Sequence, residues 1–182
     1  MGQFTFTECE VEGVYIIEPK CFTDNRGYFM ETYNYEDFEK VGLPHVFVQD
    51  NQSLSKRGVL RGLHYQKNHP QGKLVRVLKG EIFDVAVDIR KDSKTYGKWV
   101  GVHLTAESKK QLYVPEGMAH GFLVLSEEAE FAYKCTRYYH PEDEGGIRYD
   151  DEALNISWPI PEDMEVILSE KDLKNGSFKD LI

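Results

Sequence analysis

The chain has 182 residues, and its 22 lysine and arginine residues against 31 aspartate and glutamate residues give a formal net charge of −9. Its length fits one domain, and an aromatic content of 13% excludes the composition typical of disordered chains. The negative charge argues against binding to nucleic acid or to an anionic membrane, because both need a dense cationic face. We therefore expect a single folded domain over residues 1–182, in which a few arginine and lysine residues would hold any anionic ligand.

The cysteine pattern favours a reducing compartment. Cys9, Cys21 and Cys135 are odd in number and widely spaced, without a C-x-x-C pair, so neither a disulfide framework nor a structural zinc site is indicated. The first seven residues lack the basic and apolar regions of a signal peptide, and no stretch approaches the roughly 18 apolar residues of a membrane helix. We expect a cytoplasmic protein without a membrane-spanning segment.

In chain order, most segments are typical of short strands. Apolar, β-branched and aromatic residues bounded by turn formers predict strands over 14–17, 28–33, 46–48, 74–78, 82–89, 99–104, 111–114, 121–125 and 130–138. Lys79-Gly80 predicts a hairpin turn between two of these strands. The strands are evenly spaced with almost no helical periodicity between them, which predicts an antiparallel sandwich or barrel rather than a βαβ fold.

Two further segments are informative. Asn34 is a candidate N-cap for a short helix over 35–40, with Asp37 three residues after the cap and Gly42 just past the end. The acidic tail after residue 159 is expected to wrap around the surface, with Ile167 and Leu168 apolar enough to dock.

The predicted strand over 82–89 has one fully apolar face and one mixed face that carries Asp84 and Asp88. One interpretation is that these carboxylates face water, as one side of an antiparallel sheet often does. The other is that they line a polar cavity, as in small barrels that hold a ligand. The sequence leaves both open.

Two histidine-containing segments, 58–66 and 115–122, resemble the two halves of the cupin signature. In metal-binding cupins the first half reads G-x5-H-x-H followed by Glu, and the second contains P-x-G-x-x-H. Here Gly58 and His64 match, but Gln66 replaces the second histidine and no glutamate follows in the next few residues. Of the four ligands only His64 and His120 remain, fewer than the three that a catalytic transition-metal site usually needs. We expect no metal, which leaves the histidines free for proton transfer.

His64 and Gln66 share one face of an extended strand, whereas Arg61 has the opposite parity. Gly62 lies between Arg61 and His64 and permits a bulge that would re-aim the arginine.

A longer set of segments carries a closer resemblance. In chain order the set comprises 18–19 (EP), 24–29 (DNRGYF), 47–51 (FVQDN), 60–66 (LRGLHYQ), 72–76 (GKLVR), 83–90 (FDVAVDIR), 115–122 (PEGMAHGF), 133–134 (YK), 138–139 (YY), 144–145 (EG) and 168–172 (LSEKD). Together they resemble the nucleotide-sugar 3,5-epimerases of the cupin superfamily over nearly the whole chain. The resemblance implies an all-β fold, a cupin-type antiparallel β-barrel (jelly roll) with a few short peripheral helices, and no cofactor.

The implied reaction is epimerisation at C3 and C5 of dTDP-4-dehydro-6-deoxy-D-glucose to dTDP-4-dehydro-L-rhamnose, in dTDP-L-rhamnose biosynthesis. Both C–H bonds are acidic because they flank the C4 ketone, and inversion needs a base on one face and an acid on the other. The resemblance assigns His64 as the base, Tyr133 as the acid, and Lys73, with His120 as a neighbour, as the group that stabilises the enolate oxygen. A tyrosine with a pKa of about 10 stays protonated at neutral pH and can donate.

The resemblance also assigns Asp172 as the carboxylate that orients His64. Taken alone, the sequence favours a different role, because residues 169–172 (SEKD) form a capping box with Asp172 at its third helical position. Asp84 is a competing partner for His64.

For substrate binding, the resemblance implies a set that includes His120 as well as Arg26, Glu31, Gln49, Asn51, Arg61, Tyr139, Glu144 and Lys171. Guanidinium groups match phosphate oxygens, and Tyr139 would stack on the base while Tyr138 packs elsewhere. In the family, the residues matching Arg26 and Glu31 reach a neighbouring subunit through an exchanged N-terminal strand, which implies a homodimer.

Three alternatives stay open. A single-site epimerase of another dTDP-4-keto-deoxysugar pathway would use the same residues. A cupin that binds a sugar nucleotide without turning it over is disfavoured by the pair of His64 and Tyr133. A metal-dependent dioxygenase or isomerase is disfavoured by Gln66.

Overall fold

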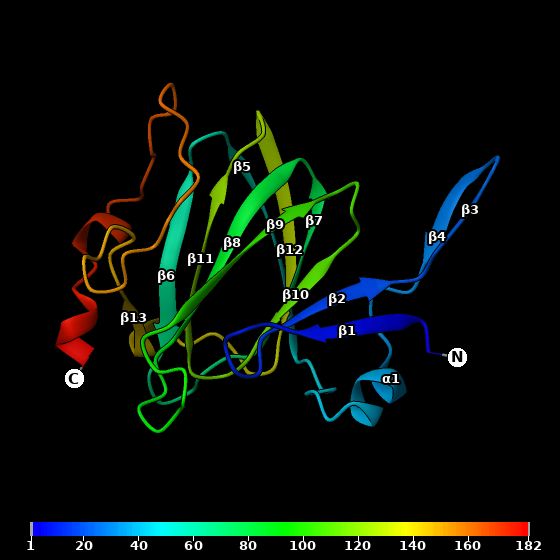
Figure 1. The fold of residues 1–182 in the computed structure, drawn as a ribbon, viewed down its shortest axis with the longest axis horizontal. Helices are drawn as coiled ribbons and strands as arrows, with labels where there is room; N and C mark the ends of the chain where they lie inside the picture. Colours follow the sequence, from blue (N-terminus) through cyan, green and yellow to red (C-terminus); the bar gives the residue numbers. More distant parts are fainter. Residues whose placement is uncertain (1, 182) are drawn as a thin grey trace.

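The computed structural model describes residues 2–181, which form mainly antiparallel β-strands (Figure 1). The strands are β1 (Phe4–Glu8), β2 (Tyr15–Pro19), β3 (Cys21–Asp24), β4 (Gly27–Met30), β5 (Gln49–Lys56), β6 (Leu60–Gln66), β7 (Lys73–Lys79), β8 (Glu81–Asp88), β9 (Trp99–Thr105), β10 (Gln111–Val114), β11 (Met118–Val124), β12 (Glu128–Cys135) and β13 (Glu144–Gly146). The helical elements are α1 (Tyr35–Lys40) and three 3₁₀ turns, η1 (Pro141–Asp143), η2 (Asp172–Lys174) and η3 (Phe178–Leu181). Among residues 2–181, no helix has the length and apolar character to cross a membrane.

The strands form two main sheets and one separate hairpin. The larger sheet has the order β1-β2-β10-β7-β12-β5, and the smaller has the order β13-β6-β11-β8-β9. All strand pairs are antiparallel, and the chain crosses from one sheet to the other at most of its connections. This is the jelly-roll arrangement that the resemblance to cupins implies, so the predicted fold class is confirmed.

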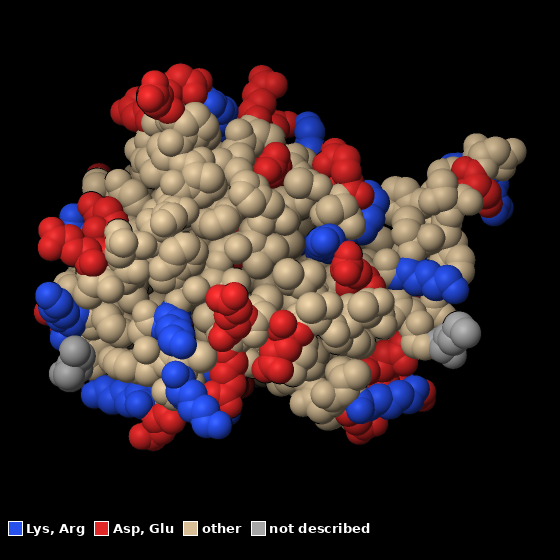
Figure 2. Space-filling model, viewed as in Figure 1, with Lys and Arg blue, Asp and Glu red and all other residues tan. Residues whose placement is uncertain are grey.

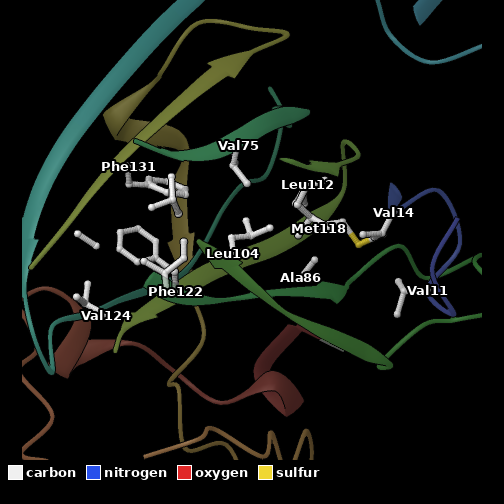
Figure 3. Packing of buried hydrophobic residues seen from close by; sticks show 14 residues of the cluster. Val11, Val14, Val75, Ala86, Leu104, Leu112, Met118, Phe122, Val124 and Phe131 are labelled. Carbon is white, nitrogen blue, oxygen red and sulfur yellow. The ribbon is translucent and has the colours of Figure 1, made fainter. Parts of the chain in front are cut away.

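The two sheets enclose the main hydrophobic core (Figure 3). Val75 of β7 and Phe131 of β12 point inward from the larger sheet, and Ala86 of β8 and Phe122 of β11 meet them from the smaller one. All four side chains are at most 5% exposed. Burying a large apolar side chain contributes about 1.5–3 kcal/mol, so this core is what holds the two sheets together.

The C-terminal segment covers the outer face of the smaller sheet (Figure 1). Phe83, Val85 and Val87 of β8 pack there against Leu154 and Phe178. β8 is therefore buried on both faces.

The water-facing interpretation of Asp84 and Asp88 is wrong, because both residues are fully buried. Asp84 lies on the inner face of β8 and bonds to His120. Asp88, at the end of the strand, bonds to the side chains of Arg90 and Thr95 in the following loop.

The tail docks at the predicted place, through the side chain of Leu168 and the backbone of Ile167, whose own side chain is 49% exposed. The backbone N–H of Ile167 donates to the Gly58 carbonyl at 2.8 Å, and the N–H of Leu60 donates to the Ile167 carbonyl at 3.0 Å. Leu168 packs against the cluster of Leu60 and Leu123. The tail thereby runs alongside the start of β6.

The predicted helix is confirmed as α1. The Asn34 side chain accepts a hydrogen bond from the Asp37 N–H at 3.2 Å, and Gly42 follows the helix with a positive φ of 74°. Phe38 is fully buried and packs edge-on against Phe4 and Phe6. The helix thus anchors β1 to the body of the molecule.

Two strand predictions need correction. Residues 46–48 precede the strand, and β5 begins at Gln49. The hydrophobicity pattern did not predict β5 because the inner face of this strand carries the polar residues Asn51, Ser53 and Ser55. The Lys79-Gly80 turn is not a hairpin, since it connects β7 and β8 in different sheets.

Gly80 makes this crossing possible. It has a positive φ of 79°, and a Cβ atom there would lie far inside van der Waals contact with the carbonyl oxygen of Glu128.

We predict that Gly80→Ala lowers the free energy of unfolding by about 3 kcal/mol or more, since it combines backbone strain with a clash against backbone. Gly42→Ala is the matched control: its φ is 74° and its added Cβ meets no atom within 4 Å, so only the backbone cost of about 1 kcal/mol is expected. Urea denaturation measures both. Equal losses in the two variants would contradict the role of Gly80.

Candidate active site

A polar cavity of about 310 Å³ lies between the two sheets. Its walls come from β5, β7 and β12 on one side and from β6 and β11 on the other, through Asn51, Gln52, Ser53, Arg61, His64, Lys73, His120, Gly121, Phe122, Phe131 and Tyr133. An adjoining hollow is lined by His64, Lys73 and Tyr133 together with Gln66, Tyr139 and Glu144. The structure thus brings most of the predicted site residues to one place.

A bulge in β6 lets two side chains of opposite parity reach this cavity. His64 pairs with His120 of β11, but Arg61 pairs with Phe122, so two residues of β6 lie opposite Gly121. Gly62 in the bulge has a φ of 122°. Arg61 and His64 therefore both line the cavity, and Ser55 of β5 accepts a hydrogen bond from the Arg61 Nε at 3.1 Å.

Asp172 is the carboxylate that bonds to His64, with 2.5 Å between Asp172 Oδ1 and His64 Nε2. The other oxygen, Oδ2, accepts from the Ser169 hydroxyl at 2.9 Å, and the same hydroxyl accepts from the Asp172 N–H at 3.0 Å. The predicted capping box is wrong, because η2 begins at Asp172 and its N-cap, Lys171, makes no side-chain cap bond. The Ser169 turn and the dyad exist together. Burial opposes ionisation of Asp172, but the hydrogen bond and charge of His64 and the bond from Ser169 keep the pKa of Asp172 below its usual value.

Asp84 does not contact His64 and instead pairs with the second histidine. Its Oδ1 lies 2.8 Å from His120 Nε2, and both side chains are almost fully buried. Within residues 2–181, the other oxygen, Oδ2, is buried without a hydrogen-bond partner. The cavity thus holds two separate histidine–carboxylate pairs.

A third carboxylate, Glu144 of β13, approaches the other nitrogen of His64, with 3.8 Å between Glu144 Oε1 and His64 Nδ1. Glu144 Oε2 accepts from the Tyr139 hydroxyl at 2.5 Å and from the Lys171 ammonium group. Burial opposes ionisation, but the bonds from Lys171 and Tyr139 lower the pKa of Glu144. Glu144 is therefore ionised at neutral pH and connects His64 to the cavity mouth.

Tyr133 and Lys73 occupy the wall opposite His64, on β12 and β7. The Lys73 Nζ lies 6.0 Å from the centre of the Tyr133 ring. Burial raises the pKa of Tyr133 and lowers the pKa of Lys73, because it disfavours the charged form of each. Tyr133 is thus a neutral proton donor at physiological pH.

Gln49 and Asn51 of β5 connect the cavity to the Tyr139 loop. The Gln49 side chain accepts from the Tyr139 N–H at 2.9 Å and donates to Asn51 Oδ1 at 3.1 Å. Asn51 donates in turn to the buried Cys135 thiol at 3.7 Å. Tyr138 is 64% exposed, so the expectation that it packs against the protein is wrong.

Arg26 and Glu31 do not join the cavity within residues 2–181. Arg26 lies at the turn of the β3–β4 hairpin, which projects from the body, and pairs with Asp24 at 2.5 Å (Figure 1). Glu31 accepts a hydrogen bond from Asn34 at 3.4 Å.

Four supporting residues were missed by sequence reasoning. They are Ser55, Gln66, Cys135 and Ser169. Two of them had a visible signal: Ser169 as the first residue of the expected capping box, and Gln66 at the second histidine position of the cupin signature, on the same strand face as His64. No group of three or more His, Cys, Asp or Glu side chains between residues 2 and 181 is arranged to hold a metal.

The face shown in Figure 2 has acidic and basic side chains interspersed around its rim, without a continuous basic surface. The cations that could hold an anionic ligand are those that line the site, Arg61, Lys73 and Lys171.

The lowered pKa of Asp172 predicts how stability depends on pH. A carboxyl whose pKa is lower in the folded than in the unfolded state stabilises the fold above its unfolded pKa of about 3.9, and this contribution is lost as the pH falls through the folded value. The wild type should therefore be more stable than Asp172→Asn at pH 5, and the difference should shrink progressively below about pH 4. Urea denaturation of both proteins between pH 3 and 7 measures it. A difference that stays constant over this range would contradict the assignment.

Comparisons with known proteins agree with this site. The family model of dTDP-4-dehydrorhamnose 3,5-epimerase matches residues 8–180. A dTDP-4-dehydrorhamnose 3,5-epimerase of Methanothermobacter thermautotrophicus is 56% identical over 172 residues, which cover 94% of this chain and 93% of that protein.

Solved structures are similar over the same range. The epimerase of that name from Elizabethkingia anophelis NUHP1 superimposes with a TM-score of 0.94 at 52% identity, covering 98% of each chain. The dTDP-6-deoxy-D-glucose-3,5-epimerase from Legionella pneumophila Philadelphia 1, in complex with dTDP-4-keto-L-rhamnose, superimposes with a TM-score of 0.93 at 50% identity, covering 98% of this chain and 97% of that one. With fold and sequence in agreement over nearly its whole length, the chain belongs to the dTDP-4-dehydrorhamnose 3,5-epimerase family.

Proposed function

We propose that this protein epimerises dTDP-4-dehydro-6-deoxy-D-glucose at C3 and C5 to give dTDP-4-dehydro-L-rhamnose, a step of dTDP-L-rhamnose biosynthesis. The observation that carries the proposal is that His64 and Tyr133 project from opposite sheets into one cavity. A sugar ring held between them would have a base on one face and an acid on the other. Inversion of a carbon next to a ketone requires this arrangement.

His64 acts as the base through its Nδ1 atom. The Nε2 atom is engaged by Asp172 at 2.5 Å, so its hydrogen points at a carboxylate and the lone pair remains on Nδ1. The negative charge of Asp172 stabilises the imidazolium ion that forms when a C3 or C5 proton is taken. Asp172 thus orients the base and favours its protonated form.

The electrons left by the proton move onto the C4 oxygen, where Lys73 stabilises the developing enolate, with His120 as its neighbour in the cavity wall. Preorganised donors aimed at such an oxygen contribute about 3–4 kcal/mol each in a site that excludes water. The hydrogen bond between Asp84 and His120 Nε2 fixes the orientation of the His120 ring.

Tyr133 returns a proton from the opposite face and so completes each inversion, which leaves a phenolate on Tyr133 and the abstracted proton on His64. Proton exchange with solvent then restores both groups before the next carbon reacts. Its raised pKa keeps the hydroxyl protonated until it is needed. The sugar must present C3 and then C5 to the same two side chains, so a rotation or ring change between the two steps is part of the proposal.

The nucleotide lies at the mouth of the cavity. Arg61 and Lys171 are the cations that would hold the diphosphate, and Tyr139 would stack on the thymine base with Gln49, Asn51 and Glu144 as polar neighbours.

Free cysteines at positions 9, 21 and 135 support a place in the cytosol.

Hydrogen exchange tests the reaction and separates it from single-site epimerisation. Incubation with dTDP-4-dehydro-6-deoxy-D-glucose in deuterated water should place deuterium at both C3 and C5, read by NMR of the sugar. Label at one carbon only would indicate a single-site epimerase, and no label would exclude turnover. His64→Asn, which keeps the shape but loses the basic atom, should reduce exchange at both carbons by at least about 10²-fold while dTDP still binds.

We further propose that the protein is a homodimer in which the N-terminal segment of one subunit completes the site of the other. The β3–β4 hairpin projects from the body and exposes Phe22, Tyr28 and Phe29 by 46%, 57% and 68% (Figure 1). Apolar rings that project in this way are typical of a surface covered by a partner. Arg26 at the hairpin tip would then contribute a cation to the phosphate-binding region of the partner's cavity.

Subunit mixing tests this exchange. Arg26→Ala and His64→Asn should each be nearly inactive as homodimers, but a mixed dimer contains one cavity with both residues intact. Refolding the two variants together at equal ratio should restore about a quarter of the wild-type activity, since half of the dimers are mixed and each has one complete site. No recovery, in a mixture shown by tagged subunits to contain the mixed dimer, would contradict the exchange.

A further inference from the structure

Gln66 is a buried polar side chain that the proposed chemistry does not use. It ends β6 two residues after His64, at the position where metal-binding cupins carry a ligand, and it is 7% exposed. Its Nε2 donates to the carbonyl oxygens of His69 at 2.6 Å and Tyr138 at 3.3 Å, and its Oε1 accepts from the His140 N–H at 2.7 Å.

These three hydrogen bonds require both the NH₂ group and the carbonyl oxygen of a side-chain amide. The partners are two carbonyl oxygens and one N–H, so they fix which end of the amide faces which segment. A carboxylate at this position would face two carbonyl oxygens without a proton to donate, and an apolar side chain would leave three backbone groups unpaired.

The bonded groups lie on either side of Tyr139. The Tyr138 carbonyl and the His140 N–H are the neighbouring backbone groups, and the N–H of Tyr139 itself is held by Gln49 at 2.9 Å. The Tyr139 residue is 47% exposed and its hydroxyl contacts Glu144. The Tyr139 ring is therefore held at its hydroxyl end by Glu144 and at its other end by the backbone groups that Gln66 and Gln49 bind.

A second set of contacts makes the supporting loop rigid. Asp143 accepts from the backbone N–H groups of Asn68 at 2.9 Å and His69 at 2.8 Å. The His69 ring stacks on the His140 ring with 4.2 Å between centres. The segment after β6 and the segment after Tyr139 thus form one unit, and Gln66 joins that unit to both sides of Tyr139.

We propose that Gln66 is a positioning residue for nucleotide recognition, which holds the Tyr139 ring in the orientation that stacks on the base. The inference rests on the proposed role of Tyr139. Gln66 occupies the position of a metal ligand in metal-binding cupins. Under this proposal its role is in nucleotide binding rather than in proton transfer. Its effect should fall on the nucleoside end of the substrate and spare the phosphates.

The test measures binding of dTDP and of pyrophosphate by calorimetry. Gln66→Met, which keeps the length of the side chain and removes all three bonds, should raise the Kd for dTDP about tenfold and leave the Kd for pyrophosphate within about twofold. Gln66→Glu, which keeps only the bond from His140, should raise the Kd for dTDP at least as much. For the sugar nucleotide, KM should rise in both variants with little change in kcat.

A double-mutant cycle separates positioning from general damage. In a Tyr139→Ala background, Gln66→Met should change the Kd for dTDP by less than about twofold, because the ring it positions is absent. Thr136→Val is the control: it removes the hydrogen bond from the Gly72 N–H and the bond to Glu116 without touching a neighbour of Tyr139, and should leave the Kd unchanged.

Several results would overturn the inference. They are an unchanged Kd for dTDP in both Gln66 variants, an equal rise in the Tyr139→Ala background, or an equal loss of pyrophosphate affinity. A wild-type protein that does not bind dTDP would remove the proposed function as well, so the two failures are distinguishable. Thermal melting checks that each variant is folded. If Gln66→Met does not fold, Gln66→Glu is the variant that tests the inference.

Discussion

The pairing of two cavity histidines with buried carboxylates is the interaction on which the site depends. Between the sheets the interior changes from an apolar core to a polar cavity, and each polar group there needs a partner because burial of an unpaired charge is costly. Asp84 pairs with His120 and Asp172 pairs with His64, both within 2.8 Å. Removing one partner of a buried pair costs about 3–5 kcal/mol, so the catalytic constellation is also part of the fold.

This pairing links the C-terminal segment to the chemistry. Asp172 comes from that segment and reaches His64 only because the tail docks beside β6, through the backbone bonds of Ile167 and the packing of Leu168. Phe178 buries the same segment against β8 further along. A change that loosens this docking would therefore remove the carboxylate that orients His64.

Much of the fold and of the site could be predicted from sequence for identifiable reasons. The helix after Asn34 has a local cap, and most core strands have dense apolar runs that need no tertiary context. β5 was missed because its inner face is polar, and a hydrophobicity pattern cannot distinguish a polar cavity wall from a loop. The two interpretations of Asp172 seemed exclusive, yet one residue makes both kinds of contact. Its backbone N–H donates to the Ser169 hydroxyl, and its carboxylate binds His64.

The partners of the site residues could not be predicted in the same way. Ser55, Cys135 and Gln66 are polar or small residues that acquire a role only through strands and loops distant in sequence. The buried state of Asp84 and Asp88 depends on a covering tail and a loop, which no pattern within the strand encodes. The motifs supplied the candidate reacting side chains, and the structure supplied the residues that contact them.

The central claim is that His64 and Tyr133 act from opposite faces of the sugar. Tyr133→Phe removes only a hydroxyl, so the base can still take a proton and return it to the same face. In deuterated water this variant should incorporate deuterium faster than it inverts either carbon, whereas the wild type should show the two together. NMR of the sugar measures both rates in one sample. Inversion of C3 and C5 by Tyr133→Phe at the wild-type rate would show that another group is the acid and would contradict the account.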